Sequence, residues 1–119
     1  VFAGYTEINE EEDYFSNQIP KMLLNKESEL LYTSRSPVPG NKNNKFKNSY
    51  RQVCIYAYTL NALKLFCSQE KTPIEEIEDL ELLRFLENGI KVKMVKLSNI
   101  SISVDNPEDL KKVEQILNK

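Results

Sequence analysis

The sequence contains no histidine. Histidine is the commonest general base in enzymes and the usual partner of nucleophilic serine and cysteine, so its absence excludes Ser-His and Cys-His catalytic arrangements. The two cysteines, Cys54 and Cys67, lie in apolar surroundings without Cys-x-x-Cys spacing, which excludes a zinc site and predicts reduced thiols. Any chemistry must therefore use carboxylates, cations and a bound metal ion.

Long apolar runs are also missing. No segment approaches the roughly 18 apolar residues that a membrane helix needs, and no signal-peptide pattern opens the chain, so we expect a cytoplasmic protein without a membrane partner. A length of 119 residues predicts one domain, and 29% charged residues with a net charge of -2 give no indication of nucleic-acid binding. Because the chain opens at Val1 without a methionine, we expect it to be a piece of a longer protein.

Acidic residues are absent between Leu30 and Gln69, so all 18 lie outside this window. The window holds the basic residues Arg35, Lys42, Lys45, Lys47, Arg51 and Lys64. A basic segment in an acidic protein suits a small anionic ligand such as a carboxylate or phosphate, although the lysines could simply solubilise a long loop. Arg35 directly follows a predicted strand, where its guanidinium could offer two N–H groups to a carboxylate.

The pattern of apolar residues, caps and turn formers predicts an α/β fold. We expect a mixed, mostly parallel sheet with flanking helices and a projecting β-hairpin that is a candidate oligomerisation arm. Strands are predicted at 1–8, 19–24, 30–34, 53–58, 92–97 and 102–104, and helices at 10–13, 61–66, 73–88 and 107–117. The strand at 53–58 shows little alternation and is expected to be buried on both faces.

Asp105 lies between the short strand and the last helix, ahead of the capping residue Asn106 and of Pro107. Ligands and metal ions bind at the carboxyl ends of strands in open α/β sheets, so Asp105 is a candidate Mg²⁺ ligand. The alternative is that Asp105 only helps to cap the helix.

Three further side chains are candidates for ligand binding. On a continuous helix at 73–88, Glu81 falls within the apolar stripe, where a carboxylate needs either a partner such as Arg84 or a ligand hydroxyl. Glu75 on the same helix is predicted to be solvated. Gln52 and Tyr56 share one strand face and form either a cavity wall or a polar edge of the core.

Four segments together resemble one family: 31–39, 51–58, 72–89 and 103–110. They are similar to the carboxyl-terminal half of 3-deoxy-manno-octulosonate (Kdo) cytidylyltransferases, the CMP-Kdo synthetases, with the resemblance running from about Ile19 to the end. It implies half of a nucleotide-diphospho-sugar transferase-like fold. Residues 1–119 would be the sugar-binding and dimerisation part, without the amino-terminal CTP-binding half and therefore inactive alone.

The resemblance also implies a reaction. In it, CMP passes from CTP to the anomeric hydroxyl of Kdo with release of pyrophosphate, in the presence of Mg²⁺, which activates a lipopolysaccharide sugar. By position, Asp105 matches a catalytic metal ligand, Tyr56 and Glu81 match sugar contacts, and Arg35 falls near the sugar acid. Residues 19–34 match the part through which family members form homodimers.

Two positions depart from the family pattern. Gln52 stands where a histidine is common, and Leu82 where a glutamine is common, both close to the sugar. The alternatives are therefore a cytidylyltransferase for an acylneuraminate or another sugar acid, and a non-catalytic oligomerisation or binding module of the same fold.

Overall fold

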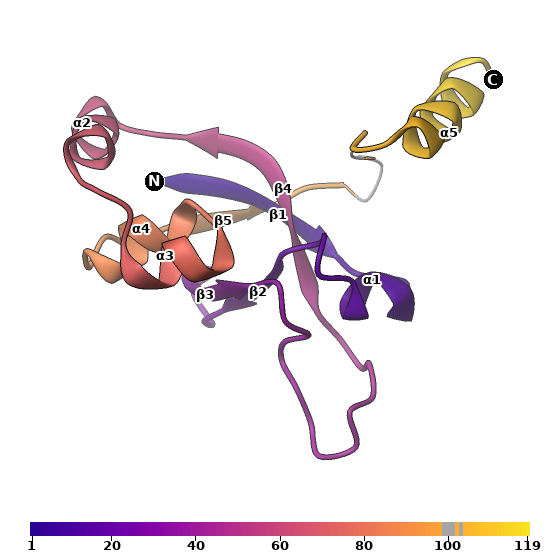
Figure 1. Cartoon of the computed structure of the whole chain (residues 1–119), viewed down its shortest axis with the longest axis horizontal. Helices are drawn as coiled ribbons and strands as arrows, with labels where there is room; N and C mark the ends of the chain where they lie inside the picture. Colours follow the sequence, from indigo (N-terminus) through magenta and orange to yellow (C-terminus); the bar gives the residue numbers. More distant parts are fainter. Residues whose placement is uncertain (99–101, 103) are drawn as a thin grey trace.

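A computed structural model describes residues 1–98, 102 and 104–119. Five strands form one mixed sheet in the order β3-β2-β4-β1-β5, and helices flank it (Figure 1). The strands are β1 (Phe2–Glu7), β2 (Lys21–Leu24), β3 (Leu30–Ser34), β4 (Tyr50–Ala57) and β5 (Lys93–Lys96). The predicted α/β class is confirmed.

The pairing of the strands is mainly antiparallel, so the expected predominance of parallel strands is wrong. β1 and β5 are parallel, whereas β1 with β4, β2 with β3, and β2 with β4 are antiparallel. A parallel pair needs a long crossover connection, usually a helix. β2 and β3 are joined by a tight turn, and the connection from β3 to β4 is a loop without regular structure at 35–49.

The core lies on one face of the sheet. Leu82 and Phe85 pack from a helix against Ala3, Tyr5 and Met94 of β1 and β5. The opposite face has exposed apolar side chains, including Phe2, Ile55 and Val95. The strand predicted at 53–58 is therefore not buried on both faces as expected.

The predicted helix at 73–88 is two helices, α3 (Pro73–Glu78) and α4 (Leu82–Glu87). Asp79 ends α3 in the left-handed region with φ of 53°, and its N–H donates to the carbonyl of Glu75. Pro73 is the first residue of α3, and the carboxylate of Glu75 accepts from the N–H of Thr72 at 3.1 Å. Because the break turns the chain, the helical stripe calculated for one continuous helix does not hold beyond Asp79.

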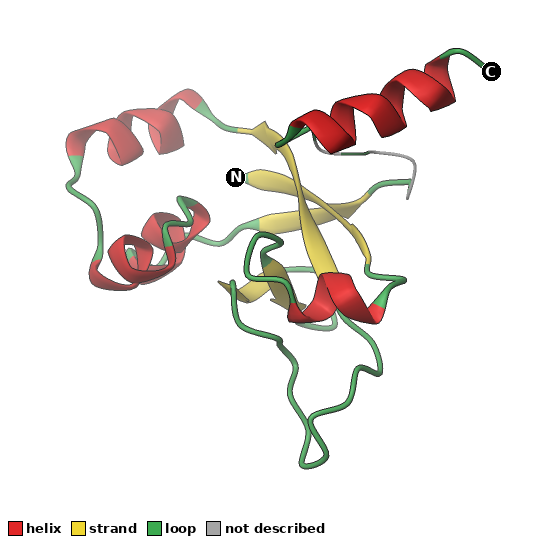
Figure 2. Ribbon diagram, turned by 45° about the vertical axis from the view of Figure 1, so that its right-hand side comes forward, coloured by secondary structure: helices red, strands yellow, loops and turns green. Residues whose placement is uncertain are grey.

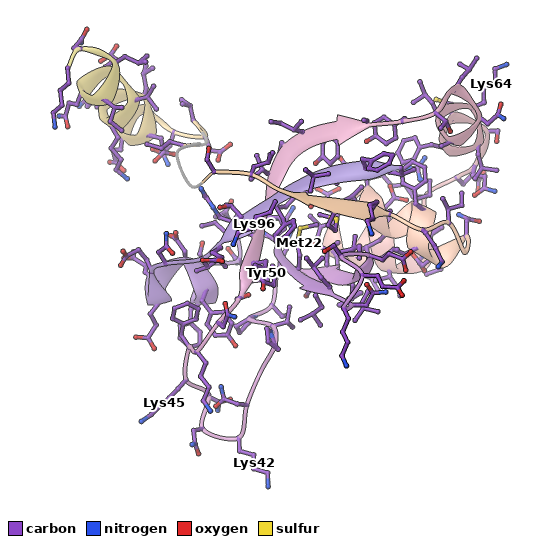
Figure 3. All side chains as sticks on the ribbon, turned by 180° about the vertical axis from the view of Figure 1, so that it is seen from behind. Met22, Lys42, Lys45, Tyr50, Lys64 and Lys96 are labelled. Atoms are coloured by element: carbon purple, nitrogen blue, oxygen red, sulfur yellow. The ribbon has the colours of Figure 1, made fainter. Side chains whose placement is uncertain are left out.

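The hairpin at 19–34 is confirmed, but it forms the edge of the sheet and does not project. Met22 is 0% exposed and Leu30 is buried in the core. The projecting part is the loop at 37–48, whose tip carries Lys42 and Lys45 (Figure 3). Tyr14 of α1 (Glu11–Phe15) anchors this loop, because its hydroxyl donates to the carbonyl of Pro39 at 2.8 Å.

Helices α2 (Leu60–Ser68) and α5 (Pro107–Leu117) match the prediction. The side chain of Asn106 accepts from the N–H groups of Glu108 and Asp109, which makes it the cap of α5. The apolar periodicity of 107–117 predicts an inner stripe with Leu110 and Leu117, but this stripe is not buried, since Leu110 is 48% exposed and Leu117 is 78% exposed. Figure 2 shows α5 standing apart from the other helices.

The strand predicted at 102–104 includes position 103, which lies outside the described residues. Ile102 and Val104 have no regular secondary structure. Among the described residues, no helix is both long enough and apolar enough to cross a membrane.

Candidate functional site

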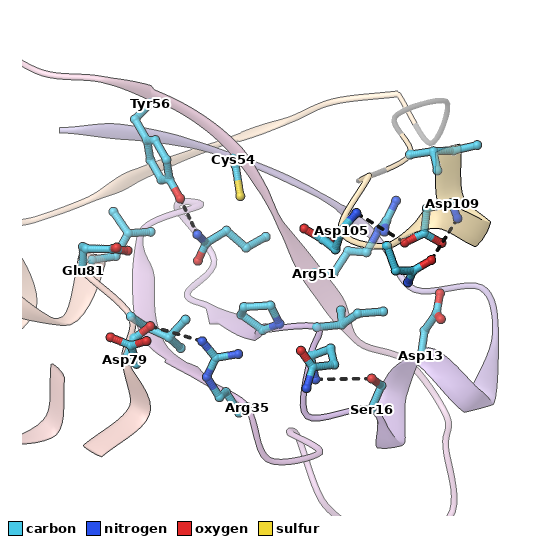
Figure 4. Close-up of a pocket in the computed structure, with 18 of the residues that line it drawn as sticks. Asp13, Ser16, Arg35, Arg51, Cys54, Tyr56, Asp79, Glu81, Asp105 and Asp109 are labelled. Carbon is cyan, nitrogen blue, oxygen red and sulfur yellow. Dashed lines mark hydrogen bonds between the residues drawn. The ribbon is translucent and has the colours of Figure 1, made fainter. Parts of the chain in front are cut away.

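A cavity of about 1280 Å³ opens where several parts of the chain meet. Most of its lining comes from the connection between α1 and β2, the end of β3, β4, the α3–α4 junction and the start of α5, with Asp13 of α1 and Phe66 of α2 added. All five residues singled out from the sequence line it: Arg35, Gln52, Tyr56, Glu81 and Asp105. Figure 4 shows Tyr56, Glu81 and Arg35 on one side of this space and Asp105 on the other.

Arg35 is held in place by main-chain carbonyl groups. Its Nε donates to the carbonyl of Glu78 at 2.7 Å, its Nη1 to that of Asn17 at 3.1 Å, and its Nη2 to that of Asp79 at 3.2 Å. A guanidinium has five N–H donors. These three bonds leave two donors that they do not use, beside the cavity, which suits an anionic group of a ligand.

Gln52 and Tyr56 form a polar pair on the cavity wall. The amide Nε2 of Gln52 donates to the phenol oxygen of Tyr56, while the amide Oε1 is buried and has no hydrogen-bond partner among the described residues. Burial raises the pKa of Tyr56, and nearby Cys54 and Glu81 raise it further. Tyr56 is therefore a neutral phenol near pH 7, and the pair offers a donor and an acceptor suited to a ligand hydroxyl.

Glu81 is exposed and immediately precedes α4, which corrects the prediction that it lies in an apolar stripe. The helix break at Asp79 is the reason. The buried carboxylate is that of Glu75, which was predicted to be solvated but is 1% exposed. Arg84 pairs with Glu75 at 2.6 Å and not with Glu81. Glu81 is left lining the cavity, where it contributes to the raised pKa of Tyr56 and Tyr58.

Asp105 is exposed at the cavity edge, next to the start of α5. The capping bonds of α5 come from Asn106, and the backbone N–H of Asp105 donates to Oδ2 of Asp109 at 3.4 Å. Within the part of the chain that the structure describes, no three carboxylate or thiol groups are placed to hold a metal ion together. Mg²⁺ often binds through one or two carboxylates plus substrate phosphates and waters, and a single Asp105 fits that mode.

The lysines of the projecting loop do not line the cavity. Lys42, Lys45 and Lys47 are all exposed, which agrees with a solubilising role. Arg51, from the same basic window, does line the cavity. Of the basic residues in this window, Arg35 and Arg51 reach the site because Arg35 follows the end of β3 and Arg51 lies in β4.

Two polar side chains next to the site were missed from the sequence. Lys21 is 0% exposed, and Glu78 accepts hydrogen bonds from the end of β3. No sequence signal distinguishes them, because Lys21 lies at the polar end of a short apolar run and Glu78 is one of several acids on a helix. The role of Glu78 depends on contacts with a segment more than 40 residues away, and that of Lys21 on a contact with Arg35, 14 residues away.

A family model described as "Cytidylyltransferase" matches residues 3–98. Among curated relatives, the 3-deoxy-manno-octulosonate cytidylyltransferase of Thermodesulfovibrio yellowstonii is 39% identical over 93% of this chain and 46% of its own length. That of Protochlamydia amoebophila is 35% identical over 96% of this chain and 45% of its own length. The chain therefore spans about half the length of the curated relatives it matches.

The comparison with solved structures includes a match over nearly the whole chain. It is the structure of CMP:2-keto-3-deoxy-manno-octonic acid synthetase complexed with CTP. The match has a TM-score of 0.88 and 26% sequence identity, and it covers 98% of this chain and 48% of that one.

Proposed function

Because the chain belongs to the cytidylyltransferase family, we propose that it supplies the sugar-acid site of an enzyme that transfers CMP from CTP to Kdo. In this reaction the anomeric hydroxyl attacks the α-phosphorus of CTP, the bond to the β-phosphate breaks, and pyrophosphate leaves. The observation that carries the proposal is the convergence of Arg35, Gln52, Tyr56 and Glu81 on one cavity. Both curated relatives described above are named as cytidylyltransferases for this sugar acid, which agrees with the proposal.

The chemistry of the cavity suits a polyhydroxylated acid. The two remaining guanidinium donors of Arg35 would bind the carboxylate of the sugar. The orphan Oε1 of Gln52 would accept from one sugar hydroxyl, since a buried acceptor without a partner costs about 1–3 kcal/mol. Glu81 would accept from another hydroxyl, and Tyr56 stays neutral and can donate.

Asp105 would hold Mg²⁺ together with the phosphates of the nucleotide. The ion supplies charge neutralisation on the phosphates when it is bound. This chain would present one carboxylate, that of Asp105, on the side of the cavity opposite Arg35 (Figure 4). CTP binding itself would depend on the half of the enzyme that the relatives have in addition.

We also propose a homodimer that forms through residues 19–34. β3 is the end strand of the described sheet, but the N–H of Leu30 at its start already donates to the carbonyl of Val92 at 2.9 Å, so a second chain would contact the part of the strand beyond Leu30. Leu31 on this strand is 60% exposed, which supplies an apolar contact at the edge.

The reaction is tested by joining this chain to the amino-terminal half of the Thermodesulfovibrio yellowstonii relative. Pyrophosphate release from CTP is then measured with Kdo, with N-acetylneuraminate and with other 3-deoxy sugar acids. We expect release with Kdo, and release only with N-acetylneuraminate would reassign the sugar. No release with any sugar acid, under conditions where the intact relative is active, would contradict the proposal.

Substitution of Asp105 separates the enzyme from a non-catalytic module of the same fold. Asp105→Ala should abolish activity of the joined protein and weaken its Mg²⁺-dependent affinity for CTP. Its stability should stay within about 0.5 kcal/mol of the parent, because the side chain is exposed. Glu114→Ala, on an exposed position of α5, is the matched control. A pure scaffold would lose neither activity nor nucleotide affinity.

A further inference from the structure

Two charged side chains form hydrogen bonds with the backbone of Arg35, one with its N–H and one with its carbonyl. Its N–H donates to Oε2 of Glu78 at 2.9 Å, and its carbonyl accepts from Nζ of Lys21 at 2.6 Å. The guanidinium is then held by the carbonyls at the end of α3. The end of α3 thus positions both the main chain and the side chain of Arg35, and Lys21 of β2 holds its carbonyl.

The carboxylate of Glu78 accepts three hydrogen bonds from β3 and the residue that follows it. Besides the N–H of Arg35, its carboxylate accepts from Oγ of Ser34 at 2.6 Å and from the phenol of Tyr32 at 3.0 Å. Burial alone would raise the pKa of Glu78, but these hydrogen bonds hold it below its usual value. The carboxylate is therefore ionised near pH 7, and it fastens the last turn of α3 to the strand that leads into Arg35.

Lys21 is the less expected member of the group. Its side chain is 0% exposed, and its Nζ donates to the carbonyls of Ser16 at 2.5 Å and Arg35 at 2.6 Å. Burial of an ammonium group is costly unless hydrogen bonds compensate. Burial and nearby Arg35 lower the pKa of Lys21, while Glu78 opposes the change. Lys21 does not line the cavity, so it cannot act on a ligand there directly.

We propose that Lys21 and Glu78 are positioning residues whose role is to hold the Arg35 guanidinium in the orientation that receives the ligand carboxylate. The inference rests on the proposed function for the nature of that ligand. Stability alone does not require this arrangement, since buried charges can often be replaced by apolar residues of similar volume without loss. Lys21 and Glu78 both form hydrogen bonds with the main chain of Arg35, which lines the cavity.

The physical gain is preorganisation. An unrestrained arginine loses much rotamer freedom when it binds a carboxylate, and that loss weakens binding. When the guanidinium is already held by three carbonyl groups, less freedom remains to be lost. Release of the backbone of Arg35 should therefore weaken carboxylate binding by roughly tenfold.

The test uses Lys21→Met and Glu78→Gln, which keep side-chain size and remove the charge. Lys26→Met and Glu76→Gln are the matched controls, because both positions are exposed and lie on the same hairpin and the same helix. Two quantities are measured on this chain by NMR: the exchange of the Arg35 guanidinium N–H signals, and the dissociation constant for Kdo from amide shifts.

We expect the guanidinium signals of Arg35 to broaden and exchange faster in both test variants but not in the controls. Affinity for Kdo should fall about tenfold in each test variant. In an Arg35→Ala background the same two substitutions should cause no further loss of affinity for Kdo. A general structural defect would lower the affinity in that background as well. If Lys21→Met does not fold, Tyr32→Phe removes one donor to Glu78 and should give a smaller change in the same direction.

Unchanged Arg35 signals in Glu78→Gln, or losses of affinity that persist in the Arg35→Ala background, would overturn the inference. The two proposals fail in different ways. If the parent chain does not bind Kdo, the proposed ligand is wrong, whereas the guanidinium signals still decide whether Lys21 and Glu78 hold Arg35.

Discussion

The buried ion pair between Glu75 and Arg84 predicts a large loss of stability when one partner is removed. Nη2 and Nε of Arg84 donate to Oε1 and Oε2 of Glu75 at 2.6 and 2.7 Å. Nη1 also donates to the carbonyls of Phe66 and Gln69, and the guanidinium lies 3.8 Å from the centre of the Phe66 ring. This one side chain therefore ties α4 to α3 and to the end of α2.

The expected cost of Arg84→Met follows from burial. The side chain of Glu75 is 1% exposed and that of Arg84 is 12% exposed. Removal of one partner from a buried pair costs roughly 3–5 kcal/mol. Because Arg84 keeps some contact with water, we expect the lower end, about 3 kcal/mol. At about 4 °C per kcal/mol for a chain of this size, the Tm should fall by about 12 °C.

Urea unfolding followed by far-ultraviolet circular dichroism measures this loss. Lys71→Met is the matched control, because Lys71 and Asp79 form a pair whose side chains are 55% and 76% exposed, and it should cost less than about 0.5 kcal/mol. The double variant Glu75→Met with Arg84→Met should be more stable than Arg84→Met alone, since it leaves no unpaired buried charge.

The effect should also depend on pH. The hydrogen bonds from Arg84 lower the pKa of Glu75, burial raises it, and the N–H of Thr72 lowers it again, with a net decrease. A carboxyl with a lowered pKa in the folded state stabilises the protein above its unfolded pKa of about 4.3 and loses that contribution as the pH falls through the folded pKa. The gap between the parent and Arg84→Met should therefore be large at pH 7 and narrow below about pH 4. A loss under about 1 kcal/mol at pH 7, or a gap independent of pH, would refute this reasoning.

Three further predictions follow from single features. Asn106→Ala removes the cap of α5 and should cost about 1 kcal/mol of helix stability, seen as faster amide exchange in α5, whereas Asn118→Ala should have little effect. Burial raises the pKa of Tyr56, so an absorbance titration of the phenols should show a strongly alkaline component that disappears in Tyr56→Phe; an unchanged titration would contradict its burial. Leu31→Glu should convert the proposed dimer to a monomer by light scattering, and Ile77→Glu, at a position that is 84% exposed, should not.

Local patterns in the sequence were sufficient for most of the secondary structure. Pro73 and Asn106 start helices through a fixed φ and a side-chain cap, and the carboxylate of Glu75 accepts from the N–H of Thr72; these signals act over three or four residues. The hairpin at 19–34 is likewise specified by its turn residues. The prediction of one continuous helix at 73–88 failed for a local reason, because Asp79 adopts the left-handed conformation and ends α3.

The candidate site was predicted in composition but not in detail. Arg35, Gln52, Tyr56, Glu81 and Asp105 were singled out from the sequence and its family resemblance, and the structure brings all of them to one cavity. Their roles at that site remain predictions. The sequence assigned burial to the wrong carboxylate, because a helical stripe calculated across the break places Glu81 inside and Glu75 outside.

The sequence by itself determined which segments become helices, strands and turns, because capping, turn formation and apolar periodicity are decided by near neighbours. Only the tertiary structure decided the direction of strand pairing, the partner of Arg84 and the burial of Lys21. Each of these depends on which distant segments share a low-dielectric interior. A charge is tolerated there only where hydrogen bonds from another part of the chain meet it, as the contacts of Lys21 and Glu78 with the main chain of Arg35 do.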